Sequence, residues 1–282
     1  MTGTALGRTT RYVALGDSQT EGLGDGDDST GLRGWADRLA DLLAVHHPGL
    51  HYANLAVRGR LAGQVRAEQL GPALALRPDF ATVVAGVNDL LRPRFDADEV
   101  AGELDAVFAA LTAQGARVAT LTFPDVARVT PLARPLGSRV HALNSRIREA
   151  ARRHGVVVAE TADHPVVTDP RLWSADRLHA SPLGHARIAA AVAHALALPG
   201  SDGSWADPLP GPPVRPTALG ELRWAAGFLG PWMGRRLRGR SSGDGRTAKR
   251  PTLLPVLPAG SVPSPGAAEG AVGDDNRPVA PR

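Results

Sequence analysis

Short apolar runs alternate with amphipathic segments from residue 11 to residue 198, and this alternation limits the fold more than any other feature of the sequence. The runs are rich in Val, Ala and Leu and end at glycine, proline or polar residues, as buried strands do. The alternation predicts an α/β fold in which helices cover both faces of a five-stranded parallel sheet. The predicted strands are 11–16, 51–55, 79–86, 117–123 and 156–159, and the predicted helices are 35–46, a segment through Val65, Leu70 and Leu74, 96–113, 138–154 and 182–196.

The composition changes after residue 198, and this change sets the predicted boundaries. Residues 199–282 hold 14 of the 24 prolines, which is incompatible with further βαβ units. We predict a globular domain over 8–198, a proline-rich linker with an amphipathic basic helix over 199–240, and a disordered tail over 241–282. The helix is expected over 219–238, broken near Pro231.

The charge divides unevenly between the domain and the extension. Residues 1–198 carry 21 Lys and Arg against 21 Asp and Glu, whereas residues 199–282 carry 11 against 7, so the net charge of +4 comes from the extension. A neutral domain argues against a nucleic-acid partner, which needs a basic face. The basic, tryptophan-bearing segment 224–240 leaves two interpretations open: weak contact with an anionic membrane surface, or packing across the domain.

Several chemistries are excluded by the absence of cysteine, which rules out disulfides, thiolate catalysis and cysteine-ligated metal. The first eight residues contain no long apolar core, and no run reaches the length needed to span a bilayer. We therefore expect no signal peptide and a cytoplasmic protein.

Polar residues follow four of the predicted strands at the point where each strand ends. Ser18 follows the first strand, Gly59 the second, Asn88 the third, and Asp176 and His179 lie beyond the fifth. The carboxyl ends of parallel strands share one edge of the sheet, where ligands bind in open α/β folds. We therefore expect these residues to meet there.

The combination of residue types fits ester hydrolysis by a serine. Such a reaction needs a base to take the hydroxyl proton and an acid to orient that base, roles for which His179 and Asp176 are candidates beside Ser18. It also needs donors for the oxyanion, for which the N–H groups of Ser18 and Gly59 and the amide of Asn88 are candidates. Each residue alone has a plainer interpretation, since serine and asparagine are common in turns and loop histidines are commonly exposed.

At this point the chain resembles the GDSL or SGNH hydrolases over about residues 11–196. Four blocks in order carry the resemblance: residues 16–22 (Gly-Asp-Ser-Gln-Thr-Glu-Gly), Gly59, residues 86–89 (Gly-Val-Asn-Asp), and residues 176–185 with Asp176, His179 and His185. The first block has Gln19 where the family name has leucine. The resemblance implies a flavodoxin-like three-layer sandwich with Ser18, Gly59, Asn88 and His179 as signature residues.

The resulting hypothesis is a cofactor-free and metal-free hydrolase that cleaves carboxylic esters, small-molecule or lipid, through an acyl-serine intermediate. Acyl transfer at the same site and a non-catalytic binding module of the same fold remain alternatives. The Gly-x-Ser-x-Gly elbow of the other large serine hydrolase fold is absent, because position 20 is Thr. The sequence shows neither a selective pocket nor an oligomeric state.

Other polar residues near these blocks receive structural interpretations. We expect His185 to be a packing or hydrogen-bonding residue, and Asp17 and Asp89 to bind loop backbone as turn aspartates. Residues 25–28 (Asp-Gly-Asp-Asp) lack the glutamate and the glycine placement of a calcium loop, so we expect a solvated loop.

Overall fold

The structure is a computed structural model that describes residues 8–125, 131–212, 218–231, 234 and 241–257. Residues 232–233 and 235–238 of the predicted helix and residues 258–282 of the predicted tail lie outside these ranges.

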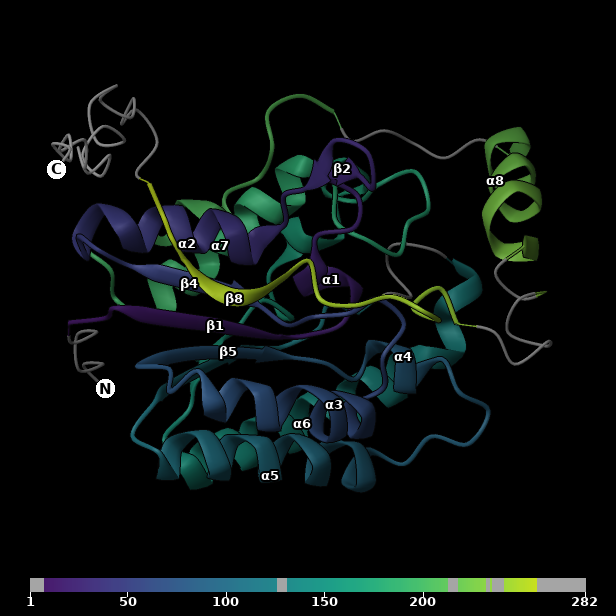
Figure 1. The fold of residues 1–282 in the computed structure, drawn as a ribbon. Coiled ribbons are helices and arrows are strands. Elements are labelled where there is room, and N and C mark those ends of the chain that lie inside the picture. Colours follow the sequence, from purple (N-terminus) through teal and green to yellow (C-terminus); the bar gives the residue numbers. More distant parts are fainter. Residues whose placement is uncertain (1–7, 126–130, 213–217, 232–233, 235–240, 258–282) are drawn as a thin grey trace, which may run out of the picture.

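The centre of the molecule is a six-stranded sheet in the order β7-β6-β5-β1-β4-β8 (Figure 1). Five of its strands are the predicted parallel ones, and in chain order they lie 2-1-3-4-5, which is the flavodoxin-like arrangement. The predicted fold class is therefore confirmed, with one strand more than expected. The strands are β1 (Arg11–Gly16), β4 (His51–Asn54), β5 (Phe80–Val84), β6 (Arg117–Leu121), β7 (Val157–Ala159) and β8 (Arg250–Pro255), and a separate small hairpin is formed by β2 (Gly26–Asp27) and β3 (Gly31–Leu32).

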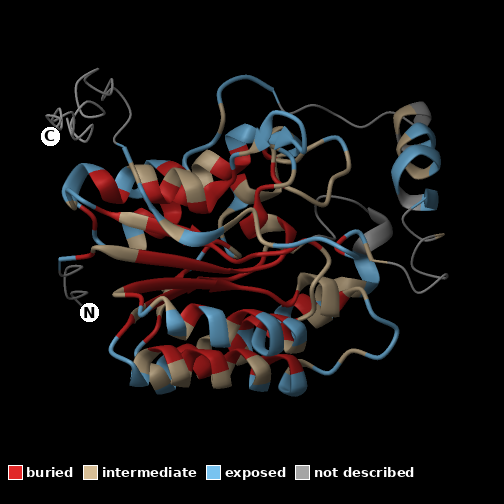
Figure 2. Cartoon of the chain, viewed as in Figure 1, coloured by how far each residue is buried: buried red, intermediate tan, exposed pale blue. Residues whose placement is uncertain are grey.

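Helices form a layer on each face of the sheet. One face is covered by α2 (Trp35–His46) and α7 (Pro182–Ala195), and the other by α3 (Ala62–Ala75), α5 (Ala97–Ala113) and α6 (Gly137–His154). Their buried sides and the sheet make one continuous apolar core (Figure 2). The remaining helical turns are α1 (Ser18–Glu21), α4 (Val87–Leu90), η2 (Pro131–Leu136), η3 (Pro165–Thr168), η4 (Pro170–Leu172) and η5 (Gly203–Ala206).

The prediction of a disordered tail from residue 241 is wrong for residues 241–257. There the chain returns to the domain, and β8 pairs antiparallel with β4, so that Leu254 lies opposite Tyr52. The prolines of β8 do not prevent this, because an edge strand needs ladder donors on one side only. Arg250 strengthens the pairing, since its Nε donates to the Tyr52 carbonyl at 2.8 Å and its guanidinium lies 5.2 Å from the Tyr52 ring centroid.

Where the structure describes the predicted helix over 219–238, the chain is helical but less regular than expected: α8 (Ala218–Trp224) is followed by a π-helical turn, η6 (Ala225–Leu229), and residues 230–231 are again α-helical. The break expected near Pro231 falls at the edge of the described residues. Leu222 and Phe228 are exposed. Across the described ranges, none of the helices has the length and apolar character required to traverse a bilayer.

Candidate active site

Ser18 lies at the carboxyl end of β1, as the first residue of the short helix α1. The strand turns at Gly16, whose φ of +154° and close approach to the Val84 carbonyl leave no room for a side chain. Asp17 then caps α1, because its Oδ1 accepts a hydrogen bond from the Gln19 N–H at 3.2 Å. The serine side chain is consequently held at the sheet edge on a rigid turn.

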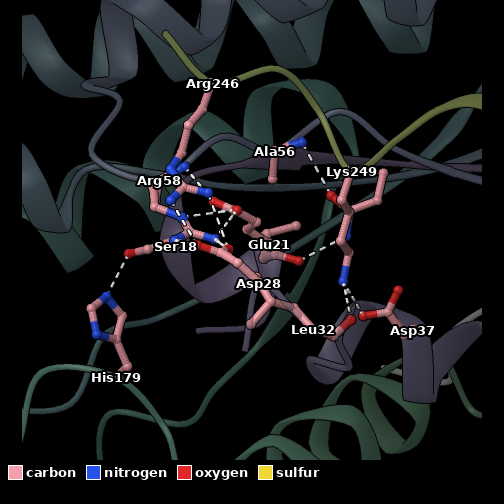
Figure 3. Close-up of polar contacts among 12 residues, drawn as sticks. Ser18, Glu21, Asp28, Leu32, Asp37, Ala56, Arg58, His179, Arg246 and Lys249 are labelled. Carbon is pink, nitrogen blue, oxygen red and sulfur yellow. Dashed lines mark hydrogen bonds and ion pairs between the residues drawn. The ribbon is translucent and has the colours of Figure 1, made fainter. Parts of the chain in front are cut away.

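The structure brings together Ser18, His179 and Asp176, which the sequence analysis singled out from opposite ends of the domain. The His179 Nε2 lies 2.8 Å from the Ser18 Oγ, and the His179 Nδ1 lies 2.6 Å from the Asp176 Oδ2 (Figure 3 shows the Ser18–His179 contact). A carboxylate only accepts hydrogen bonds, so Nδ1 carries the proton and Nε2 presents its lone pair to the serine hydroxyl. This is the arrangement required of a base that takes a proton from Ser18.

Asp176 is held by its own loop, residues 173–180, here called the His179 loop. Its Oδ1 accepts hydrogen bonds from the Ser174 hydroxyl and from the N–H groups of Leu178 and His179, at 2.6 to 3.0 Å. Burial favours a higher pKa for the Asp176 carboxyl, but the hydrogen bonds that it accepts, first of all from His179 and also from Ser174, outweigh burial and hold this pKa below its ordinary value. Asp176 is therefore ionised at neutral pH.

Gly59 lies in the turn after β4, here called the Gly59 loop (residues 57–60), with a φ of +77°. Within the described ranges, the N–H groups of Ser18 and Gly59 donate no hydrogen bond to another protein group. Neighbouring contacts tie the loop to the site: the Arg58 N–H donates to the Glu21 carboxylate of α1 at 2.6 Å, and the Arg60 carbonyl accepts from the Asn88 amide at 3.1 Å.

Asn88 also reaches the site, but its amide hydrogens already have acceptors. The Nδ2 donates to the Asp17 Oδ2 at 3.2 Å and to the Arg60 carbonyl at 3.1 Å. An oxyanion must therefore replace one of these acceptors before it binds Asn88. The sequence could not reveal this, because both acceptors come from distant segments.

Asp17 and Asp89 bind the loops around the site, in line with the interpretation from sequence. Asp17 accepts from Gln19 and Asn88, and the Asp89 carboxylate accepts from the Ala62 N–H at 3.1 Å. Asp17 is almost fully buried, and burial raises the pKa of its carboxyl to about 7.

His185 is fully buried and serves to join α2 and α7. Its Nδ1 accepts from the Trp35 N–H at 3.1 Å, and its Nε2 donates to the Leu23 carbonyl at 2.9 Å. Burial lowers the pKa of His185 to about 4, so the ring is neutral and both of its nitrogens are engaged.

Residues 25–28 form an ion-paired loop. Asp25 pairs with Arg38 at 2.5 Å, and Asp28 pairs with Arg58 and with Arg246 of the extension. Among the residues that the structure describes, no three His, Asp or Glu side chains gather in a way that would hold a metal ion.

Three residues that hold the His179 loop and the Gly59 loop were not assigned these roles from the sequence. Gln19 spans His179, since its Nε2 donates to the Leu178 carbonyl at 2.8 Å and its Oε1 accepts from the Ala180 N–H at 3.3 Å. Arg58 forms a buried pair with Glu21. The Trp224 indole of α8 donates to the Asp176 carbonyl at 3.0 Å, and this contact favours packing over a free membrane-binding helix for that residue. In the sequence, the charged Arg58 next to Gly59 was the only hint of these contacts.

An apolar cavity of about 90 Å³ lies beside the site. Its wall includes Gln19, Val87, Leu178 and Ala180, which are the chain neighbours of Ser18, Asn88 and His179. The rest of the wall is mainly aliphatic and aromatic, with contributions from β5, β6, α6 and α7. The cavity is therefore adjacent to every segment that carries a site residue except the Gly59 loop.

Comparisons with known proteins give a family and a fold. A model of the GDSL-like lipase/acylhydrolase family matches residues 14–187, which is more than half of the chain. The search of curated proteins found no match to this chain. LAE5, an α/β hydrolase enzyme from the metagenome of Lake Arreo in Spain, is 22% identical, with a TM-score of 0.56 over 69% of this chain and 97% of LAE5.

Axe2, an acetylxylan esterase from Geobacillus stearothermophilus, is 16% identical, with a TM-score of 0.58 over 71% of this chain and 100% of Axe2. A catalytic mutant of Axe2 is 18% identical, with a TM-score of 0.59 over 72% of this chain and 98% of the mutant. At these identities the likeness to the solved structures is one of fold.

Proposed function

The chain belongs to the GDSL-like lipase/acylhydrolase family and is an esterase-type hydrolase, and from this premise we propose that it cleaves carboxylic esters through an acyl-serine intermediate on Ser18. The observation that carries the proposal is the continuous contact from the Ser18 Oγ through the His179 ring to the Asp176 carboxylate, at 2.8 and 2.6 Å.

The first half of the reaction forms the acyl-enzyme. The Ser18 Oγ attacks the ester carbonyl carbon while the His179 Nε2 takes the hydroxyl proton, and Asp176 stabilises the imidazolium. The tetrahedral intermediate collapses when the C–O bond to the alcohol breaks and His179 gives its proton to the leaving oxygen. In the second half, His179 takes a proton from water, the water oxygen attacks the acyl carbon, and the Ser18 Oγ leaves with that proton.

The oxyanion of both tetrahedral intermediates needs donors that are already in place. The N–H groups of Ser18 and Gly59 are suited to this, because in the described part of the chain they have no competing protein acceptor. Asn88 contributes when the oxyanion replaces the Asp17 or Arg60 oxygen as its acceptor.

The apolar cavity supports an aliphatic acyl group as the part of the substrate that is recognised. The cavity of about 90 Å³ has room for more than an acetyl group. Each methylene group buried there contributes about 0.8 kcal/mol, which favours longer acyl chains over acetyl.

The test is turnover of p-nitrophenyl esters from acetate to dodecanoate by wild type, Ser18→Ala and Val140→Phe. We expect no turnover by Ser18→Ala and a wild-type maximum at an acyl chain longer than acetyl. Val140 lines the cavity on α6, so Val140→Phe should lower kcat/KM for octanoate and leave acetate hydrolysis nearly unchanged. Full turnover by folded Ser18→Ala would refute the proposed function. Product analysis with an added alcohol distinguishes hydrolysis from acyl transfer.

A further inference from the structure

Residues 241–249 of the extension, here called the strap, cross the domain next to the Gly59 loop. They lie outside the family match, which ends at residue 187. The strap begins as a turn with its own hydrogen bonds, from the Ser241 N–H to the Asp244 Oδ2 at 2.9 Å and from the Gly243 N–H to the Ser241 Oγ at 3.2 Å. It therefore has a defined shape where it meets the loop.

The strap and the Gly59 loop touch backbone to backbone. A methyl group added at Gly243, which is buried, would overlap the Arg58 carbonyl oxygen, and one added at Gly59 would overlap the Ser241 Oγ. Only glycine at both positions permits this approach. The strap consequently covers one side of the peptide that joins Arg58 to Gly59.

Charged groups connect the strap to the helix that begins at Ser18 (Figure 3). Arg246 donates two hydrogen bonds to Asp28, at 2.6 and 3.0 Å, and Asp28 also accepts from Arg58 at 2.8 Å. The Arg58 guanidinium and its backbone N–H both donate to Glu21, at 2.6 to 2.9 Å. The hydrogen bond from the backbone N–H of Arg58 fixes the residue immediately before Gly59 relative to α1.

The far end of the strap is anchored independently of this network. The Lys249 Nζ donates to the Asp37 carboxylate at 2.6 Å and to the Leu32 carbonyl at 3.0 Å, and β8 begins at the next residue. The strap is thus fixed to the sheet edge on one side and pressed against the Gly59 loop on the other.

We propose that the strap is a positioning segment that fixes the orientation of the Gly59 N–H for the oxyanion. This inference rests on the proposed function, in which Gly59 is an oxyanion donor. Loss of one such donor costs about 10²–10³ in kcat, and a displacement of about 1 Å costs up to about 10². The strap touches Gly59 and not the reacting atoms, so its loss reduces transition-state stabilisation rather than substrate binding.

The direct test is Gly243→Ala in the full chain, with Gly102→Ala as the control. Gly243→Ala introduces the overlap with Arg58, whereas Gly102 is exposed on α5, outside the strap, with nothing within 4 Å of an added methyl group. We expect Gly243→Ala to lower kcat on a p-nitrophenyl ester about tenfold with KM within twofold. The control should keep wild-type kcat.

Two further readouts separate positioning from general damage. Inhibition by a trifluoromethyl ketone, whose adduct with a serine carries an oxyanion, should weaken in Gly243→Ala by the same factor as kcat/KM. Amide hydrogen exchange of the peptide that contains Gly59 should speed up in this variant, and exchange of the peptide that contains His179 should not.

A second set of three variants serves if Gly243→Ala does not fold. Arg246→Ala removes the link to Asp28, Arg246→Lys retains part of it, and Arg250→Ala removes an arginine whose side chain, among the described residues, contacts Tyr52 and two β8 carbonyls. We expect kcat to fall several-fold in Arg246→Ala, to be partly restored in Arg246→Lys, and to be unchanged in Arg250→Ala.

The proposal is overturned if folded Gly243→Ala or Arg246→Ala keeps wild-type kcat, if Gly102→Ala loses kcat equally, or if KM changes instead of kcat. Failure of the proposed function has a different signature, which is turnover that survives Ser18→Ala. Amide hydrogen exchange at Gly59 in Gly243→Ala tests the contact with the strap even if the proposed function fails, because this measurement does not depend on activity.

Discussion

The two sides of the candidate site are held in contrasting ways. The His179 loop is held mainly from within, since Asp176 binds Ser174, Leu178 and His179, all within three residues of it. The Gly59 loop is held from far away along the chain, by Glu21 at a separation of 37 residues and by the strap, whose Arg246 lies 218 residues from its partner Asp28. The Asp176–His179 pair is therefore formed within one loop, to which Gln19 and Trp224 add long-range contacts, whereas the Gly59 loop is held by segments far away along the chain.

The largest expected loss of kcat/KM comes from variants of the Asp176–His179 pair. His179→Ala removes the base and should lower kcat/KM by about 10⁴–10⁶, and Asp176→Asn should lower it by about 10²–10⁴, because the imidazole loses its orienting acceptor. Steady-state kinetics and a melting curve measure both. The control His46→Ala changes an exposed histidine and should have no effect. Near-normal turnover by folded His179→Ala contradicts its assignment as the base.

The next largest loss of kcat is expected from a change in the Gly59 loop. Gly59→Ala forces a side chain at a φ of +77° into overlap with Ser241, so the loop must move and kcat should fall by about 10²–10³. Gly49→Ala is the control for backbone strain alone, since its φ is +83° and an added methyl group meets nothing within 4 Å. Equal losses of kcat in the two variants would refute an oxyanion role for Gly59.

The next prediction concerns stability rather than turnover and involves Asp17, which lies between the His179 loop and the Gly59 loop. Burial raises the pKa of this carboxyl to about 7, so between pH 4 and 7 the folded protein holds a proton that the unfolded chain releases. The contribution of Asp17 to the free energy of unfolding therefore falls as pH rises through this window, and Asp17→Asn should gain up to about 4 kcal/mol relative to wild type between pH 4 and pH 8.

Urea unfolding at a series of pH values measures this difference. His185, with a pKa of about 4, has the opposite pH dependence, and it cancels when the variant is compared with wild type. A difference between the two proteins that does not change with pH would contradict a protonated Asp17.

The smallest effect concerns the long-range contact between Gln19 and the His179 loop. Gln19→Leu removes the two hydrogen bonds to the backbone on either side of His179 and should lower kcat about tenfold with little change in KM. Gln114→Leu is the matched control, because it removes a hydrogen bond to the Leu74 carbonyl far from the site. Unchanged kcat in Gln19→Leu would show that the His179 loop needs no support from α1.

This contrast also explains what could be predicted from the sequence. The five parallel strands and the proximity of Ser18, Asp176 and His179 follow from local patterns and from the rule that strand ends share an edge. β8 and the strap could not be predicted, because their structure depends on pairing with β4 and on Asp28, and their proline content favours disorder when taken alone. The hydrogen bonds from the Asn88 amide to Asp17 and Arg60 could not be predicted either, because they also join segments far apart in the sequence.

Labelling with a fluorophosphonate, followed by mapping of the adduct by mass spectrometry, tests whether Ser18 is the nucleophile and His179 its base. We expect a single adduct on Ser18 in wild type and its suppression in His179→Ala, since the hydroxyl then lacks its base. An unlabelled Ser18 in folded, hydrolytically active protein, or labelling that is equally fast without His179, would contradict these roles.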